Sequence, residues 1–104
     1  MTTNRSLDLQ YQIGRLLGSG NFGKIHLGRH HETHEHVAIK LEQITTRTPQ
    51  LAYEYRFYKI LGQHDGIPNV HFYGQTSTYN ALAMELLGVV HILRHHWGVR
   101  LMIK

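Results

Sequence analysis

A glycine-rich segment is the part of the chain whose spacing points first to chemistry. Glycine occupies the first, third and sixth positions of Gly18-Ser19-Gly20-Asn21-Phe22-Gly23, and Lys24 and Ile25 follow. Because glycine has no Cβ, backbone amides in such a segment can approach phosphate oxygens closely, and the chain can adopt the positive φ angles of a tight turn. Plain hairpins share this spacing, so the pattern alone is a weak indication of a phosphate site.

Two charged residues further along the chain make the signal more specific. Lys40 ends the run Val37-Ala38-Ile39-Lys40, seventeen residues after Gly23, and Glu54 follows fourteen residues later. A lysine on a strand beneath the glycine segment can pair with phosphate oxygens, and a helix carboxylate can hold its ammonium by charge-assisted hydrogen bonds. The alternative is a solvated lysine and an unrelated surface acid. We expect the pair, because all three parts occur in the required order.

These residues need a sheet to position them. Period-two alternation and β-branched runs predict five strands, over residues 11–17, 24–29, 37–41, 70–73 and 79–87. The glycine segment therefore leads from strand to strand, as in a hairpin. A dinucleotide-binding unit would lead from a strand into a helix, so the sequence disfavours that kind of site.

One helix is predicted between the third and fourth strands. Thr48 precedes Pro49, an N-cap residue before a residue suited to the first turn, and Gly62 supplies the end. One apolar stripe is formed by Leu51, Tyr55 and Tyr58, which recur at i, i+4 and i+7. Glu54 lies at the edge of this stripe and requires a partner. The predicted fold class is α+β, a five-stranded antiparallel sheet with one main helix at about 49–61.

The composition is that of an ordinary globular domain. A chain of 104 residues with 41% hydrophobic and 17% charged residues has room for one domain and shows no sign of wholesale disorder. The lack of cysteine excludes disulfides and thiolate metal sites. No apolar run suits a secretory signal or a membrane span, so we expect a cytoplasmic or nuclear protein without membrane association. Residues 89–104 hold three of the eleven Lys and Arg residues and no acid, which leaves the body of the chain without a basic face for nucleic acid.

With their neighbours, these residues resemble the casein kinase I family of serine/threonine protein kinases, most closely its gamma subgroup. The matching segments are Gly18–Ile25, Val37–Glu42, Pro49–Leu51, Glu54–Lys59, Gly66–Pro68, Tyr79–Ala81 and Met84–Gly88. The resemblance implies the small lobe of a protein kinase, with the large lobe absent. It divides the chain into a flexible N-terminus at 1–8, a partial kinase domain at 9–88 and a divergent basic and apolar tail at 89–104.

The resemblance also implies a site for ATP with Mg²⁺. Met84 would be the gatekeeper at the back of the adenine pocket, and backbone groups of Glu85 and Leu87 would bond the adenine edge. The ring would be sandwiched by Leu17, Ile25 and Ala38. The implied cofactor-binding residues are Leu17, Gly18, Ser19, Gly20, Asn21, Phe22, Gly23, Lys24, Ile25, Ala38, Lys40, Met84, Glu85 and Leu87, with Glu54 as the ion-pair partner of Lys40.

The family reaction is phosphoryl transfer from ATP to serine or threonine hydroxyls of protein substrates. It requires one aspartate that orients the attacking hydroxyl and a second that binds Mg²⁺. The chain has two aspartates, Asp8 and Asp65, and neither stands in the sequence context of these roles. We therefore expect ATP binding without turnover from this chain, and no metal ligands. The alternative is a non-catalytic interaction module that competes for partners of an intact kinase.

Three further expectations concern surfaces. Apolar surface around Leu51, Tyr55, Leu86 and Leu87 is expected to promote self-association. Residues 89–104 are interpreted as a poorly ordered end rather than an amphipathic segment that binds a partner or a membrane surface. A crowded connection contains His30, His31, His34 and His36. We interpret it as a solvated turn in preference to a weak metal site, because no catalytic pattern of histidine and carboxylate accompanies it.

Overall fold

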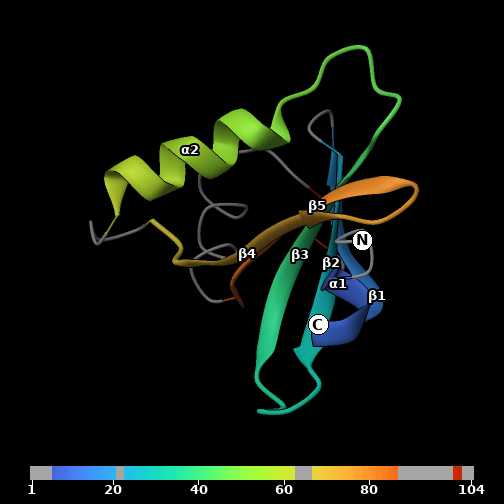
Figure 1. The fold of residues 1–104 in the computed structure, drawn as a ribbon, viewed down its shortest axis with the longest axis vertical. Helices are drawn as coiled ribbons and strands as arrows, with labels where there is room; N and C mark the ends of the chain where they lie inside the picture. Colours follow the sequence, from blue (N-terminus) through green and yellow to red (C-terminus); the bar gives the residue numbers. More distant parts are fainter. Residues whose placement is uncertain (1–5, 21–22, 63–66, 87–99, 102–104) are drawn as a thin grey trace.

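The computed structural model describes residues 6–20, 23–62, 67–86 and 100–101. The protein has the predicted α+β class, a small domain with an antiparallel sheet and one main helix (Figure 1). In chain order the elements are α1 (Ser6–Gln10), β1 (Tyr11–Gly20), β2 (Gly23–His30), β3 (His36–Gln43), α2 (Leu51–Leu61), β4 (Val70–Gln75), β5 (Tyr79–Glu85) and β6 (Arg100–Leu101).

The sheet has the strand order β4-β5-β3-β2-β1-β6, and all neighbouring strands run antiparallel. Strands β1 to β5 confirm the five predicted from the sequence. Strand β6 was not predicted: its two residues pair with Gly18 and Ser19 at the edge of β1. Most of the tail that we expected to be a poorly ordered end, 89–99 and 102–104, lies outside the described residues.

Period-two alternation gives the sheet two apolar faces. Ala38 belongs to a cluster on one face, whereas Val37 and Ile39 belong to a cluster on the other. The register of β3 with β5 continues both clusters, because Ala38 lies opposite Met84 and Ile39 lies opposite Ala83. We call the face that carries Ala38 the helix face and the face that carries Ile39 the outer face. Strand β3 is therefore buried on both sides at the centre of the domain.

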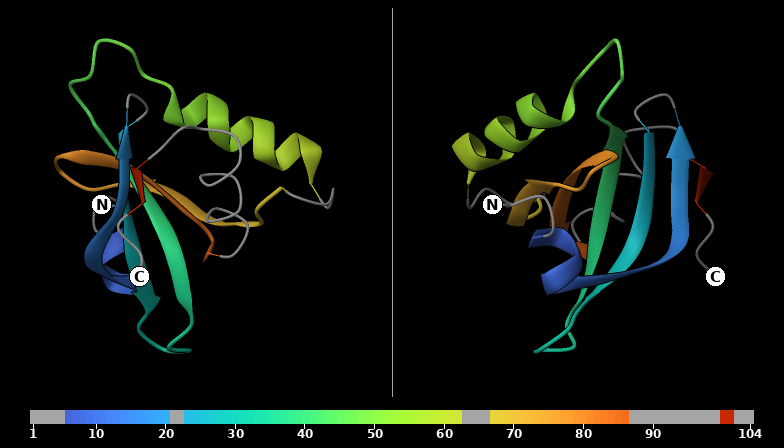
Figure 2. Two further views of the ribbon diagram at one scale, coloured as in Figure 1. Left: turned by 180° about the vertical axis from the view of Figure 1, so that it is seen from behind. Right: turned by 45° about the vertical axis from the view of Figure 1, so that its right-hand side comes forward.

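The two helices cover opposite faces of the sheet. Helix α2 packs on the helix face through Leu51, which is fully buried in the cluster of Ala38. The short helix α1 places Leu7 in the cluster of the outer face, together with Tyr11. In Figure 2, α2 and α1 lie on opposite sides of the sheet. We expected a flexible N-terminus over 1–8. Residues 1–5 lie outside the described residues, whereas Ser6, Leu7 and Asp8 belong to α1.

The N-terminal end of α2 corrects the predicted cap. The helix begins at Leu51 with Gln50 as its N-cap residue, and no side-chain cap comes from within this segment. Instead the carboxylate of Glu42, on β3, accepts hydrogen bonds from the backbone N–H groups of Gln50 at 2.6 Å and of Leu51 at 3.0 Å. Thr48 is not needed as a cap because a charged acceptor from the sheet already satisfies these donors. At the other end Gly62 adopts a φ of 59° and stops the helix as predicted.

The cap also explains the acidity of Glu42. Burial alone would raise the pKa of this carboxyl, but the hydrogen bonds from Gln50, the Asn80 amide and Leu51 outweigh burial and lower the pKa below its ordinary value of 4.5. The stability that comes from a lowered carboxyl pKa is present above the ordinary value and is lost as pH falls through the lowered one.

We predict that Glu42→Ala lowers the free energy of unfolding at pH 7 by about 1 kcal/mol, as loss of a helix cap does. Glu42→Gln removes the charge alone, so its stability difference from the original protein should shrink as pH falls below 4.5. Urea denaturation across pH 3 to 7, roughly, measures both effects. The control is Gln43→Ala at the exposed neighbouring position. Equal stability of Glu42→Ala and the original protein at pH 7 would contradict the cap.

Candidate functional site

The central feature of the helix face is an ion pair between Lys40 of β3 and Glu54 of α2. The Nζ atom of Lys40 donates to both carboxylate oxygens of Glu54, at 2.5 Å to Oε1 and 2.6 Å to Oε2. Lys40 is only 6% exposed, and the side chain of Glu54 is 22% exposed. The predicted pair is thus present. Because one carboxylate binds the ammonium with both oxygens, the position of the ammonium is fixed beneath α2.

Burial sets the electrostatics of the pair. Desolvation lowers the pKa of Lys40 below its ordinary value, and the charge and hydrogen bonds of Glu54 offset part of that effect. Tyr58 lies one turn further along α2, where burial and then the charge of Glu54 raise the pKa of its hydroxyl to about 12. The charged form of Lys40 is therefore favoured by the nearby carboxylate of Glu54. This ammonium group is suited to binding an anionic group.

Packing of α2 holds Glu54 in reach of the sheet. The ring of Tyr55 stacks on the ring of Tyr73 from β4, with centroids 4.7 Å apart and an interplanar angle of 11°. Leu51 anchors the first turn in the helix-face cluster. Between these contacts the helix periodicity directs Glu54 toward Lys40. The apolar stripe predicted for α2 is therefore what places the carboxylate.

A buried apolar cluster lies on the same face of the sheet as the ion pair. The implied adenine-sandwiching residues Leu17, Ile25 and Ala38 lie in one cluster with Met84, the implied gatekeeper, and all four are buried. The strand registers explain the grouping, because Lys40 lies opposite Ile25 on one neighbouring strand and Ala38 lies opposite Met84 on the other. The structure thus brings the side chains expected around an aromatic ring onto the face that carries the ammonium.

The glycine segment forms the turn between β1 and β2. Pairing continues up to Gly20 opposite Gly23, with Ser19 opposite Lys24 just before it. Gly23 has a φ of 117°, and a Cβ there would lie 3.2 Å from the carbonyl oxygen of Leu41, so glycine is required at this position. The predicted hairpin is confirmed, and it leads onto the strand next to Lys40. Asn21 and Phe22 lie outside the described residues.

The end of β5 carries the groups expected to bond an adenine edge. The backbone N–H of Glu85 donates to the carbonyl oxygen of Asn69 at 2.8 Å, which ties the end of β5 to the segment before β4. This N–H is therefore already used within the protein. Leu87, the second residue implied at this edge, lies outside the described residues.

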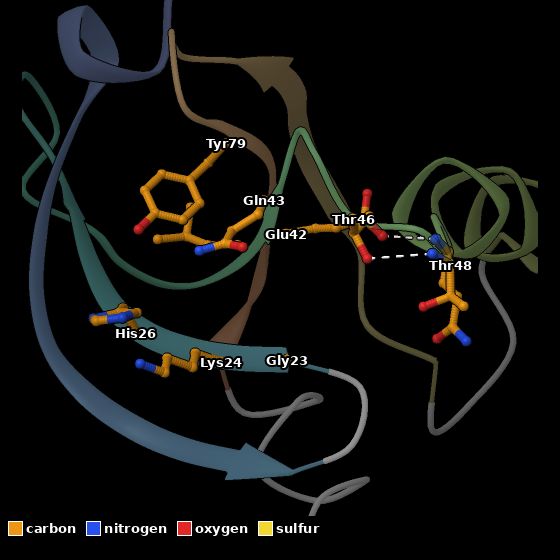
Figure 3. Close-up of a pocket in the computed structure, with 10 residues that line it drawn as sticks. Gly23, Lys24, His26, Glu42, Gln43, Thr46, Thr48 and Tyr79 are labelled. Atoms are coloured by element: carbon orange, nitrogen blue, oxygen red, sulfur yellow. Dashed lines mark hydrogen bonds between the residues drawn. The ribbon is translucent and has the colours of Figure 1, made fainter.

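A polar hollow of about 470 Å³ lies away from the ion pair, between the outer face and the loop that precedes α2 (Figure 3). Around it lie Lys24 and His26 of β2, Gln43 of β3 and Tyr79 of β5. The Nδ1 atom of His26 bonds the carbonyl oxygen of Gly14 at 3.0 Å, so Nδ1 carries the hydrogen. Sequence reasoning did not find this hollow, because its residues come from three strands and a loop. Of the glycine-rich segment, Gly23 and Lys24 line this hollow.

The crowded histidines belong to the turn between β2 and β3. The Nδ1 atom of His30 accepts hydrogen bonds from the backbone N–H groups of Glu32 and Thr33, at 3.2 Å and 3.3 Å. His34 adopts a φ of 64°, as tight turns require. In the part of the chain that the structure describes, no group of three or more metal-ligating side chains converges. No helix among the same residues is long and apolar enough to cross a membrane.

The apolar surface expected around Leu51 is corrected by the packing of α2, because this side chain is buried. Leu51 is fully buried, and Tyr55 is half-buried in its stack on Tyr73. Leu86 is half-buried, and Leu87 lies outside the described residues. Leu51 and Tyr55 of this stripe are thus packed against the sheet of the same chain, and self-association stays a prediction. Exposed apolar side chains of α2 lie on its other side.

A comparison of the sequence with models of known protein families gives no match.

We predict that Glu54→Gln lowers the pKa of Lys40 further, because the carboxylate that favours the ammonium is removed while the burial that opposes it remains. The titration of the Lys40 Cε resonance by NMR, compared between Glu54→Gln and the original protein, measures this shift. An unchanged Lys40 titration would show that Glu54 is not its electrostatic partner.

Proposed function

We propose that this chain is the ATP-binding small lobe of a serine/threonine protein kinase similar to casein kinase I. The observation that carries the proposal is the bidentate pair of Lys40 and Glu54, on a strand that adjoins the glycine hairpin. Three separate sequence signals meet at one face of the sheet. A solvated lysine and an unrelated surface acid, the alternative interpretation, would not be buried together in this way.

The residues of the helix face fit the two ends of a nucleotide. Leu17, Ile25, Ala38 and Met84, the side chains expected around an aromatic ring, are packed together in one buried cluster on this face. Lys40 offers an ammonium for phosphate oxygens, and backbone amides of the glycine hairpin offer further donors. Mg²⁺ would neutralise phosphate charge when bound with ATP, but the described part of the chain presents no cluster of ligands for it. The fit is therefore to ATP rather than to the metal.

We propose that the 104-residue chain binds ATP without transferring its phosphate. Transfer depends on a carboxylate that orients the attacking hydroxyl and another that binds Mg²⁺. Asp8 lies in α1 and Asp65 lies outside the described residues, and neither stands in the sequence context of these roles. Protein substrates belong to the reaction of the intact family. Affinity for ATP should be weak, because one lobe offers only one wall of a cleft.

We predict that Lys40→Ala weakens ATP binding at least about tenfold, the equivalent of one lost charge-assisted hydrogen bond. A fluorescent ATP analogue displaced by ATP measures the affinity, and Lys59→Ala is the matched control because Lys59 is exposed on α2. Adenosine, which lacks phosphates, should bind both variants equally. The proposal fails if Lys40→Ala and Lys59→Ala bind ATP equally well, or if the pure chain phosphorylates casein.

A further inference from the structure

The side of α2 that faces away from the sheet carries an apolar stripe. Tyr53 is 67% exposed, Phe57 is 56% exposed and Ile60 is 82% exposed. Their i, i+4, i+7 spacing aligns them along one side of the helix, opposite Leu51. Because Leu51 is buried in the helix-face cluster, this side of α2 is turned away from the sheet, which α2 covers in Figures 1 and 2. We call these three residues the outer stripe.

The outer stripe differs from the other exposed apolar residues of the protein. Leu9, Ile13 and Ile44 are also exposed, but they lie apart in the chain, on α1, on β1 and in the turn after β3. Single exposed apolar side chains are normal on a protein surface. Three large ones in line on a helix form the kind of continuous patch that marks an interaction site. Among the described surfaces, the outer stripe is therefore the strongest candidate for an interaction site.

The charges beside the outer stripe select the kind of partner. Arg56 lies over the ring of Tyr53, with its Cζ atom 5.1 Å from the ring centroid, and Lys59 follows on the same flank. Glu54 is the acid of α2, and it is turned inward to Lys40. The outer stripe is thus apolar along its length and positively charged on one flank.

We propose that the outer stripe docks an acidic amphipathic helix of another protein. Such a helix would cover the apolar residues and place its carboxylates beside Arg56 and Lys59. A second copy of this chain fits less well. Each copy carries a net charge of +4, and a symmetric contact would bring the basic flanks of two stripes together. This proposal concerns the side of α2 opposite the ATP site and does not depend on nucleotide binding.

The test uses two fluorescent synthetic helices of about 18 residues, long enough to span the stripe. Both carry leucine at i, i+4 and i+7, and their remaining faces carry glutamate in one and lysine in the other. The whole chain should bind the glutamate helix and not the lysine helix, and added salt should weaken binding. Arg56→Glu and Ile60→Ser should each weaken it at least tenfold. Ile44→Ser and Leu9→Ser, at exposed positions off the stripe, should leave it unchanged.

Several results would overturn the proposal. Equal binding of both helices would remove the charge preference on which it rests, and binding of neither would remove the site. A dimer in sedimentation that Ile60→Ser dissociates would assign the stripe to a second copy of the chain. Denaturation midpoints of the two stripe variants should match the original protein, because both positions are exposed. Stripe variants that lose binding only because they unfold would also count against it.

Discussion

The buried ammonium of Lys40 is the constraint on which the rest of the structure depends. A charge at the centre of a sheet is costly unless an opposite charge is held against it, and here Glu54 supplies that charge with both carboxylate oxygens. The position of α2 follows from this need. The helix must lie on the face of β3 that carries Lys40, at a rotation that directs Glu54 inward.

A second acidic residue of β3 fixes the position of the N-terminal end of α2. Glu42, two residues after Lys40 and on the same side of β3, binds the first free N–H groups of the helix. Strand β3 thus holds the N-terminal part of α2 by two charged contacts, one before the helix and one in its first turn. Two polar attachments and one apolar stripe leave the helix little freedom to rotate. The rotation that buries Leu51 also exposes Tyr53 on the opposite side.

Local patterns predicted the parts of the fold that local forces decide. Alternation predicted β1 to β5, and the spacing of Lys40 and Glu54 predicted their contact, because period and order along the chain carry that information. The cap by Glu42 could not be predicted, since Thr48 satisfies the local rule and only the tertiary contact overrides it. Strand β6 joins residues far apart in sequence and is too short to leave a pattern. The hollow beside His26 likewise assembles from distant segments.

The central claim is that the helix face, with the glycine hairpin and Lys40, receives ATP. Titration of the ¹⁵N-labelled chain with ATP, followed through its backbone amide resonances, tests this residue by residue. The account predicts the largest shifts at Gly18, Ser19 and Lys40. Shifts concentrated instead around Gln43 and Tyr79, at the polar hollow on the other side of the sheet, would contradict it.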